Sequence, residues 1–166
     1  MSNPPSGIII RFATEDDLPL ILDFIRGLAE YERLADACVA TDEKLRSTLF
    51  SNSPAAEVLI ASVAGEAVGF ALFFHNYSTF LAQRGVFLED LFVKPSARST
   101  GAGRALLAAL AQIAIDRDCG RFEWSVLDWN EPAIGFYKKI GAVPMDQWTT
   151  FRMSGGALRT LASSLR

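Results

Sequence analysis

The chain has 166 residues, half of them apolar, with a formal net charge of −3. This length predicts one domain over residues 1–166 that can bury a core without disulfides or a structural metal, and the mildly acidic charge argues against a nucleic-acid-binding surface. No apolar run approaches the length of a membrane helix, and the two separated cysteines suit a reducing cytosol, so we expect a cytoplasmic protein without a membrane partner.

The first third of the chain predicts a strand and two helices. Residues 7–12 are rich in β-branched side chains, which favour a strand. Thr14 is a candidate helix N-cap, with Asp17 three residues later, and apolar residues at helical spacing continue to about Glu30. A threonine followed by two acids begins a second short helix over residues 41–50.

Three strand patterns and an apolar helix follow. Residues 57–63 and 67–74 predict two strands joined by a tight hairpin, and residues 83–93 predict a longer third strand. Residues 101–118 predict a helix rich in alanine and leucine. Because its apolar residues surround most of its circumference, we expect this helix to be largely buried.

The C-terminal part predicts a strand, a helix, short strands and a last helix. Residues 121–126 form the strand pattern, and Asn130 caps a helix that ends at Gly141. Two short strands are expected around Val143 and residues 149–153, before a terminal helix. The element order predicts an α/β fold of the α+β kind, in which helices cover both faces of a mixed sheet.

The segment that joins the third strand to the apolar helix has the properties of a phosphate-binding loop. The first turn of a helix offers unpaired N–H groups and the positive end of the helix dipole. Gly101 and Gly103 would let a phosphate oxygen approach the backbone there, and Arg98 and Arg104 add positive charge. The segment is therefore a candidate pyrophosphate site.

The other interpretations of this loop are a P-loop, a dinucleotide-binding site and a plain helix cap. A P-loop requires Gly-Lys-Ser/Thr, whereas Gly103 is followed by Arg104, which excludes it. A dinucleotide-binding fingerprint requires a third glycine where Leu106 stands, and Glu123, near the spacing of a ribose-binding acid, falls inside a strand. Taken alone, the glycines are also consistent with a plain helix cap.

Four segments together resemble the GNAT acetyltransferase superfamily, and within it the spermidine/spermine (diamine) N-acetyltransferase branch. They are Leu28-Ala29-Glu30-Tyr31-Glu32, Leu88-Glu89-Asp90-Leu91-Phe92-Val93, Arg98-x-x-Gly101-x-Gly103, and the run from Trp129 to Ala142 that contains Asn130-Glu131-Pro132-Ala133 and Phe136-Tyr137. Ser99 and Thr100 depart from the pattern, because members often carry another glycine there, which implies a stiffer loop.

The resemblance implies a GNAT-like sheet, mostly antiparallel, in which a splayed pair of parallel strands over 86–93 and 121–126 holds acetyl-CoA without a metal. A backbone pairing with the coenzyme's pantetheine arm would resemble the addition of a strand to a sheet edge. The implied coenzyme-binding residues are Leu91, Phe92, Val93, Arg98, Ser99, Thr100, Gly101, Ala102, Gly103, Arg104, Asn130, Ala133 and Tyr137.

Acetyl transfer to an amine must remove an ammonium proton with a pKa of roughly 10, stabilise an oxyanion and protonate a thiolate. By resemblance, Glu89 is the candidate base, acting directly or through water, and Tyr137 is the candidate acid. Backbone N–H groups near Phe92 or Val93 would face the oxyanion. Because no Ser/His/Asp or Cys/His arrangement is evident, we expect direct transfer in a ternary complex.

These residues also have structural interpretations. Tyr137 could be a core aromatic beside Phe136. Glu89 and Asp90 are adjacent on a strand and should face opposite sides, so one of them could be a solvated acid, and Asp90 is slightly preferred for that role. Glu32 could belong to a solvated helix end.

The resemblance implies a small amine substrate, such as a polyamine or diamine, and a homodimer. The candidate substrate-binding residues are Tyr31, Glu32, Glu89, Asp90, Asp146 and Trp148. The alternatives are a protein or peptide N-acetyltransferase on the same fold and a non-catalytic module that binds acetyl-CoA or polyamine.

Overall fold

The chain forms two compact units, Met1–Ser125 and Val126–Arg166. The computed structural model describes residues 7–165. That one domain spans the whole chain stays a prediction.

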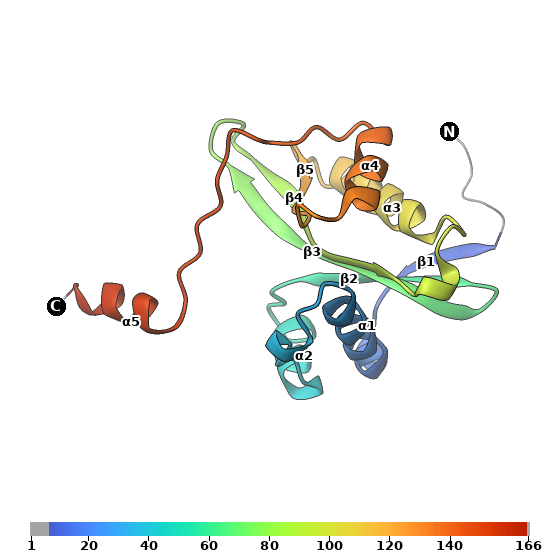
Figure 1. Cartoon of the computed structure of the whole chain (residues 1–166), viewed down its shortest axis with the longest axis horizontal. Helices are drawn as coiled ribbons and strands as arrows, with labels where there is room; N and C mark the ends of the chain where they lie inside the picture. Colours follow the sequence, from blue (N-terminus) through green and yellow to red (C-terminus); the bar gives the residue numbers. More distant parts are fainter. Residues whose placement is uncertain (1–6, 166) are drawn as a thin grey trace. The chain divides into compact units, whose positions relative to one another are not determined.

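A five-stranded sheet forms the centre of the first unit, and its strands lie side by side in chain order (Figure 1). The strands are β1 (Ile8–Phe12), β2 (Glu57–Val63), β3 (Glu66–Ser78), β4 (Gln83–Val93) and β5 (Phe122–Trp124). Neighbouring strands are antiparallel except β4 and β5, which are parallel. The predicted mixed, mostly antiparallel sheet is thereby confirmed.

Two strands differ in length from their predictions. β3 continues to Ser78, beyond the predicted end at residue 74, because it remains paired with β4 as far as Gln83. β5 is shorter than the predicted range 121–126, since only Phe122–Trp124 pair with β4.

Helices cover both faces of this sheet, as predicted (Figure 1). α1 (Leu18–Tyr31) and α2 (Asp42–Leu49) lie on one face, and α3 (Ala102–Asp116) lies on the other. The core under α1 is aromatic: the ring of Phe24 stacks on Phe70 at 5.5 Å and lies 6.1 Å from that of Phe92. These contacts attach α1 to β3 and β4.

Close backbone approach also links β3 to β4. A methyl group added at Gly69 would lie 2.5 Å from the carbonyl oxygen of Phe92. Glycine is therefore required at this position, which lies opposite Val93 in the register.

Only one side of α3 is buried, so the expectation of a largely buried helix is wrong. The buried residues are Ala102, Leu106, Leu107, Leu110 and Ala114. Ile115, in contrast, is 72% exposed. Much of the remaining apolar character comes from alanine, which favours helix formation and presents little apolar surface to water.

The second unit contains two helices, α4 (Glu131–Lys139) and α5 (Gly155–Ser163). The side-chain oxygen of Asn130 accepts a hydrogen bond from the Ala133 N–H at 3.4 Å, which confirms the predicted cap. The short strands predicted around Val143 and over 149–153 are absent from the described residues. A strand requires a paired neighbour, and the described chain provides none there.

An ion pair fixes the start of α1 through the short turn η1 (Glu15–Asp17) that precedes it. Two nitrogens of Arg11 on β1 donate to the two carboxylate oxygens of Asp17, each at 2.7 Å. The Thr14 N–H donates to the same carboxylate at 2.8 Å, which completes the predicted capping box. These contacts, above all the one from Arg11, lower the pKa of Asp17 to about 2.

The C-terminal end of α1 is fixed by backbone hydrogen bonds. The N–H of Leu34 donates to Ala29 O at 2.8 Å, and that of Arg33 donates to Glu30 O at 3.1 Å. This is a Schellman motif, and Arg33 occupies its left-handed position at φ 62°. The helix therefore ends in one defined geometry, with Tyr31 as its last residue.

A second left-handed residue lies in the loop between β4 and α3. Ser99 adopts φ 70°, two residues before Gly101 at φ 94°. A side chain costs about 1 kcal/mol or more in this region, whereas glycine adopts it freely. The position that departs from the family pattern is thus one whose backbone favours glycine.

We expect Ser99→Gly to raise the free energy of unfolding by up to about 1 kcal/mol, because it relieves the left-handed strain. Ser96→Gly is the matched control, since Ser96 lies in the same loop without a positive φ, and it should not stabilise. Chemical denaturation of both variants measures the difference. A loss of stability in Ser99→Gly would contradict this account.

Candidate active site

One edge of β4 is left open where the two parallel strands separate. β5 pairs with β4 only from Val86 to Leu88, so residues 89–93 have no partner on this side among the described strands. On the other side the Lys94 N–H donates to Val68 O at 2.8 Å. Since antiparallel pairs alternate, Phe92 also directs its N–H to β3, while Leu91 and Val93 direct theirs to the open edge.

A β-bulge in β4 reorients the side chains next to this edge. Asp90 pairs with Leu72 and Leu88 pairs with Phe73, so Glu89 has no residue opposite it. The bulge places Leu88 and Asp90 on opposite faces, although they are two residues apart. Asp90 therefore shares the α1 face with Leu72, which packs against the core beneath α1.

Three carboxylates gather between β4 and the end of α1. Burial, and then the charges of Glu89 and Glu32, raise the pKa of Asp90 to about 6. Burial also raises the pKa of Glu32, which follows the last residue of α1. Such a cluster favours a cation, because a nearby positive charge would relieve the mutual repulsion.

Glu32, Glu89 and Asp90 form this carboxylate cluster. The solvent exposure of its members contradicts the expectation that Asp90 is the solvated acid. Glu89 is exposed and Asp90 is half-buried, so Glu89, and not Asp90, is the solvated acid. The reason is the bulge, which turns Asp90 toward α1. Alternation along an unbroken strand could not have distinguished the two residues.

The glycine loop, residues 94–101, connects β4 to α3 and contains the short turn η3 (Pro95–Ala97). The Thr100 hydroxyl donates to Ala97 O at 2.7 Å, and the Ala102 N–H donates to that hydroxyl at 3.4 Å. The N–H groups of Gly103 and Arg104 have no acceptor within residues 7–165. The first turn of α3 thus keeps donors available for an anion.

Space and charge at this turn also suit a phosphate group. A methyl group added at Gly103 would meet only Val93 Cγ2, at 3.7 Å, so the glycine is open on its outer side. Neither Arg98 nor Arg104 forms a salt bridge within the part of the chain that the structure describes. The Arg98 guanidinium instead lies over the ring of Tyr31, 4.6 Å from its centroid.

The first unit thus brings together Tyr31, Glu32, Glu89, Asp90 and residues 91–104, which run from the end of β4 through the loop to the first turn of α3. Sequence reasoning missed the bulge at Glu89, the Schellman motif and the stacking of Arg98 on Tyr31. The adjacent acids on β4 were a signal for the bulge, because an unbroken strand would have sent one of them toward the core.

The other candidate residues lie in the second unit, and their roles stay predictions. Tyr137 is on α4, with its ring 5.7 Å from that of Phe136. Asp146 and Trp148 follow α4 outside any helix or strand, and Trp148 is 75% exposed. Asn130 and Ala133 form the cap of α4.

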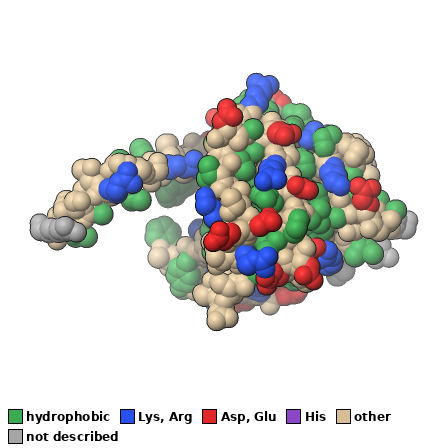
Figure 2. Space-filling view, turned by 90° about the horizontal axis from the view of Figure 1, so that it is seen from below, with side chains coloured by type: hydrophobic (Ala, Val, Ile, Leu, Met, Phe, Trp, Pro, Cys, Tyr) green, Lys and Arg blue, Asp and Glu red, His purple; other side chains and the backbone are tan. Residues whose placement is uncertain are grey.

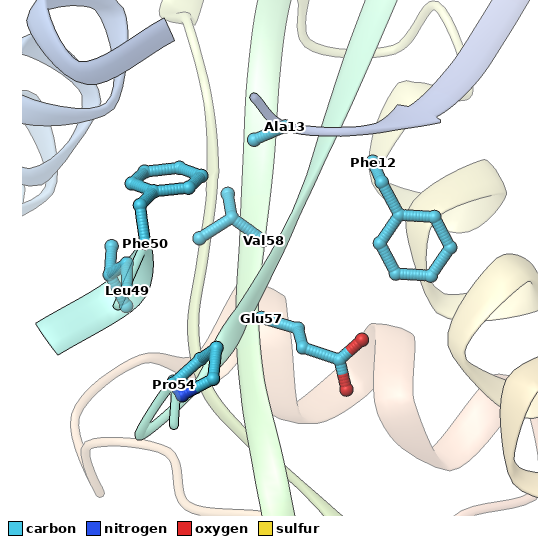
Figure 3. A pocket seen from close by; sticks show the side chains of 8 residues that line it. Phe12, Ala13, Leu49, Phe50, Pro54, Glu57 and Val58 are labelled. Atoms are coloured by element: carbon cyan, nitrogen blue, oxygen red, sulfur yellow. The ribbon is translucent and has the colours of Figure 1, made fainter. Parts of the chain in front are cut away.

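A pocket of about 180 Å³ lies elsewhere in the first unit (Figure 3). It is lined by residues from the end of β1, the end of α2 and the start of β2, and Figure 3 shows Glu57 and Phe12 on one side of it and Phe50 on the other. None of the predicted site residues lines this pocket.

Charged side chains of both signs are mixed on the surface of the described residues (Figure 2). Figure 2 shows acidic and basic side chains intermingled on the face that it displays, without a single basic patch. Among residues 7–165, no three acidic, histidine or cysteine side chains form a group that could hold a metal ion. No helix in that range is long and apolar enough to cross a membrane.

Comparisons with known proteins agree with this geometry. Residues 27–142 match the acetyltransferase (GNAT) family. The chain is 38% identical to the thialysine N-epsilon-acetyltransferase of Sus scrofa over 168 residues, covering 95% of this chain and 98% of that relative. It is 32% identical to the L-ornithine N5-acetyltransferase of Arabidopsis thaliana over 197 residues, covering 92% and 86%.

Solved structures show the same fold. An integron cassette protein from the mobile metagenome of V. cholerae superposes with a TM-score of 0.78 at 29% identity, covering 94% of this chain and 98% of that one. Because the family match spans more than half of the chain, and relatives above 30% identity span nearly all of it, the chain belongs to the GNAT acetyltransferase family and is an N-acetyltransferase.

Proposed function

We propose that this enzyme transfers the acetyl group of acetyl-CoA to a primary amine of a small polyamine, diamine or diamino acid, in a ternary complex without an acyl-enzyme. The observation that carries the proposal is the arrangement along β4. Its bulge presents Glu89 and Asp90, and the next residues, Leu91 to Val93, form the open edge that leads into the glycine loop. An amine site thus adjoins an acyl-donor site on one strand.

On the coenzyme side, the backbone provides most of the binding groups. The C=O groups of Leu91 and Val93, together with the N–H of whichever of the two does not face the oxyanion, would pair with the pantetheine arm as an added strand does. The N–H groups of Gly103 and Arg104 at the first turn of α3 would donate to the pyrophosphate. Phe92 supports this edge from the core, because its own N–H is directed to β3.

The remaining residues assigned to the coenzyme lie in the loop after β4 and in the second unit. Ser99 and Gly101 shape the loop through their left-handed backbones. Thr100 holds Ala102 at the helix start. Asn130, Ala133 and Tyr137 are assigned to the coenzyme by the family resemblance alone.

On the amine side, the carboxylate cluster would attract and orient a cation. Glu89 is the proposed base, because it is the solvated member and can pass the ammonium proton to water. Asp90 and Glu32 would hold a second positive charge of the substrate. Asp146 and Trp148, in the second unit, stay candidates from the sequence alone. Such a site favours a molecule with two amines over a monoamine.

The transfer then requires few further groups. The deprotonated amine attacks the thioester carbonyl, and the oxyanion accepts hydrogen bonds from the N–H of Val93 or Leu91 at the open edge. The carbon–sulfur bond breaks, and Tyr137, which the family resemblance alone assigns as the acid, gives its phenol proton to the departing thiolate. The attacking nitrogen loses its second proton as the amide forms, and through solvent this proton restores the phenol of Tyr137, while the proton taken up at Glu89 also passes to solvent.

The relatives support this substrate class. Two of them are named for the amine that they acetylate: the thialysine N-epsilon- and the ornithine N5-acetyltransferase, both acting on a side-chain amine of an amino acid. A spermidine/spermine N(1)-acetyltransferase-like protein of Homo sapiens is 31% identical over 163 residues, covering 92% of this chain and 23% of that relative. The proposal therefore includes both diamino acids and polyamines.

We also propose a cytoplasmic homodimer. The segment after α4 carries exposed apolar side chains, among them Phe151 at 92% and Val143 at 79% exposure. Exposed apolar groups in such number favour association with another surface. Sedimentation velocity at micromolar concentrations tests this proposal, and a monomer there would contradict it.

Thiol release over an amine panel tests the proposed function. We expect turnover with acetyl-CoA and thialysine, ornithine, spermidine or a short diamine, and a kcat/KM at least about tenfold lower for a monoamine of equal length, which lacks the second charge. A lysine peptide and an N-terminal peptide are the comparison substrates. Preferred acetylation of peptides, or coenzyme binding without thiol release for any amine, would contradict the proposal.

The raised pKa of Asp90 predicts how the free energy of unfolding changes with pH. Its folded pKa of about 6 exceeds the ordinary 3.8, so the ionised carboxylate destabilises the fold above about pH 6 and the cost disappears below about pH 4. Asp90→Asn should raise the free energy of unfolding by about 1–2 kcal/mol at pH 8 and little at pH 4. It should also raise the KM for a diamine and leave that for acetyl-CoA unchanged.

Asp17→Asn is the matched control, because it should change the free energy of unfolding at pH 8 in the opposite direction. Its folded pKa of about 2 lies below the ordinary 3.8, so the ion pair stabilises the fold above about pH 4 and is lost as the pH falls toward 2. This variant should be destabilised at pH 8. Denaturation curves at both pH values measure the pair, and destabilisation of Asp90→Asn at pH 8 would contradict the account.

A further inference from the structure

Arg98 differs from the paired arginines of the first unit in what it contacts. Arg11, Arg117 and Arg121 each form a salt bridge with a carboxylate. Arg98 forms none within residues 7–165, and its guanidinium lies over the ring of Tyr31, 4.6 Å from the centroid. A carboxylate would neutralise the cation, whereas an aromatic ring holds it and leaves its charge in place.

The two ends of this contact are both held in fixed geometry. Tyr31 is the last residue of α1, directly before the Schellman motif that ends the helix. Arg98 follows η3, and the Thr100 hydroxyl bonds back to Ala97 across it. The contact therefore connects the end of α1, beside the carboxylate cluster, to the glycine loop.

A ring contact of this kind also bears on which atoms of Arg98 remain available. A guanidinium that lies over a ring uses its flat face, and its N–H donors point outward in its own plane. These in-plane donors match the bidentate geometry of a phosphate. With its flat face on the ring of Tyr31, Arg98 would therefore keep its N–H edge available for an anion.

We propose that Tyr31 is a positioning residue for the acyl donor: its ring holds the Arg98 guanidinium so that the N–H edge is ready for the pyrophosphate of coenzyme A. This inference rests on the proposed function. It assigns Tyr31 to the coenzyme side, through Arg98, whereas the sequence placed it in the amine site. The hydroxyl of Tyr31 has no part in this role, since the ring face is sufficient.

Calorimetric titration with coenzyme A compares Tyr31→Phe, which keeps the ring, with Tyr31→Leu, which removes it. We expect the Kd of Tyr31→Phe to stay within about twofold of the wild-type value and that of Tyr31→Leu to rise by about three- to fivefold. Tyr77→Leu is the matched control, because Tyr77 is on β3 and 61% exposed. Its Kd should be unchanged.

Two further measurements separate positioning from a general structural effect. In an Arg98→Ala background, Tyr31→Leu should weaken coenzyme A binding no further, since the ring acts only through Arg98. With S-acetylpantetheine, an acyl donor without the pyrophosphate, Tyr31→Leu should leave the donor KM unchanged. Thermal unfolding verifies that each variant is folded.

Several outcomes would overturn the inference. An unchanged Kd for coenzyme A in Tyr31→Leu with a raised amine KM would show that Tyr31 serves the amine alone. An equal loss in the Arg98→Ala background, or with S-acetylpantetheine, would show that the ring does not act through Arg98. A wild-type protein that does not bind coenzyme A overturns the proposed function and this inference together, whereas wild-type binding with an unchanged Tyr31→Leu overturns the inference alone.

Discussion

β5 pairs with β4 over only three residues, and the candidate site follows from that short pairing. Had β5 continued, the N–H groups of Leu91 and Val93 would bond to it as the N–H of Phe92 bonds to β3. Instead they border an edge that an extended ligand can occupy. The opposite edge of β4 is fixed by the close approach of Gly69, so the open edge stays in register with the core.

The charges near this edge are separated by sign. The carboxylate cluster lies where the bulge turns Asp90 toward α1, whereas Arg98 lies in the loop that follows β4 and Arg104 lies in the first turn of α3. A cationic amine and an anionic coenzyme would each find opposite charge, with the reacting groups between them. The contact with the ring of Tyr31 holds the positive charge of Arg98 near the carboxylate cluster without neutralising it.

Structural features that depend on interactions between residues close in the sequence were predictable. The capping box at Thr14, the cap at Asn130 and the helices around the sheet follow from short-range hydrogen bonding and apolar spacing. The bulge at Glu89 and the Schellman motif at Arg33 depend on tertiary pairing and on residues that tolerate strain, so their sequence signals are weak. The strand predicted over 149–153 failed because strand propensity cannot supply a partner. The family resemblance, carried by the motifs around the glycine loop, gave the coenzyme assignment that periodicity could not.

Backbone amide exchange, followed by NMR with and without coenzyme A, tests the central claim most directly. If the ligand adds to the open edge, exchange should slow by at least about tenfold at Leu91, Val93, Gly103 and Arg104, because these N–H groups gain acceptors. Phe92 should change little, since its N–H is already bonded to β3. Slowing at Phe92 without Leu91 and Val93, or slowing confined to the pocket around Phe12 and Phe50, would contradict the account.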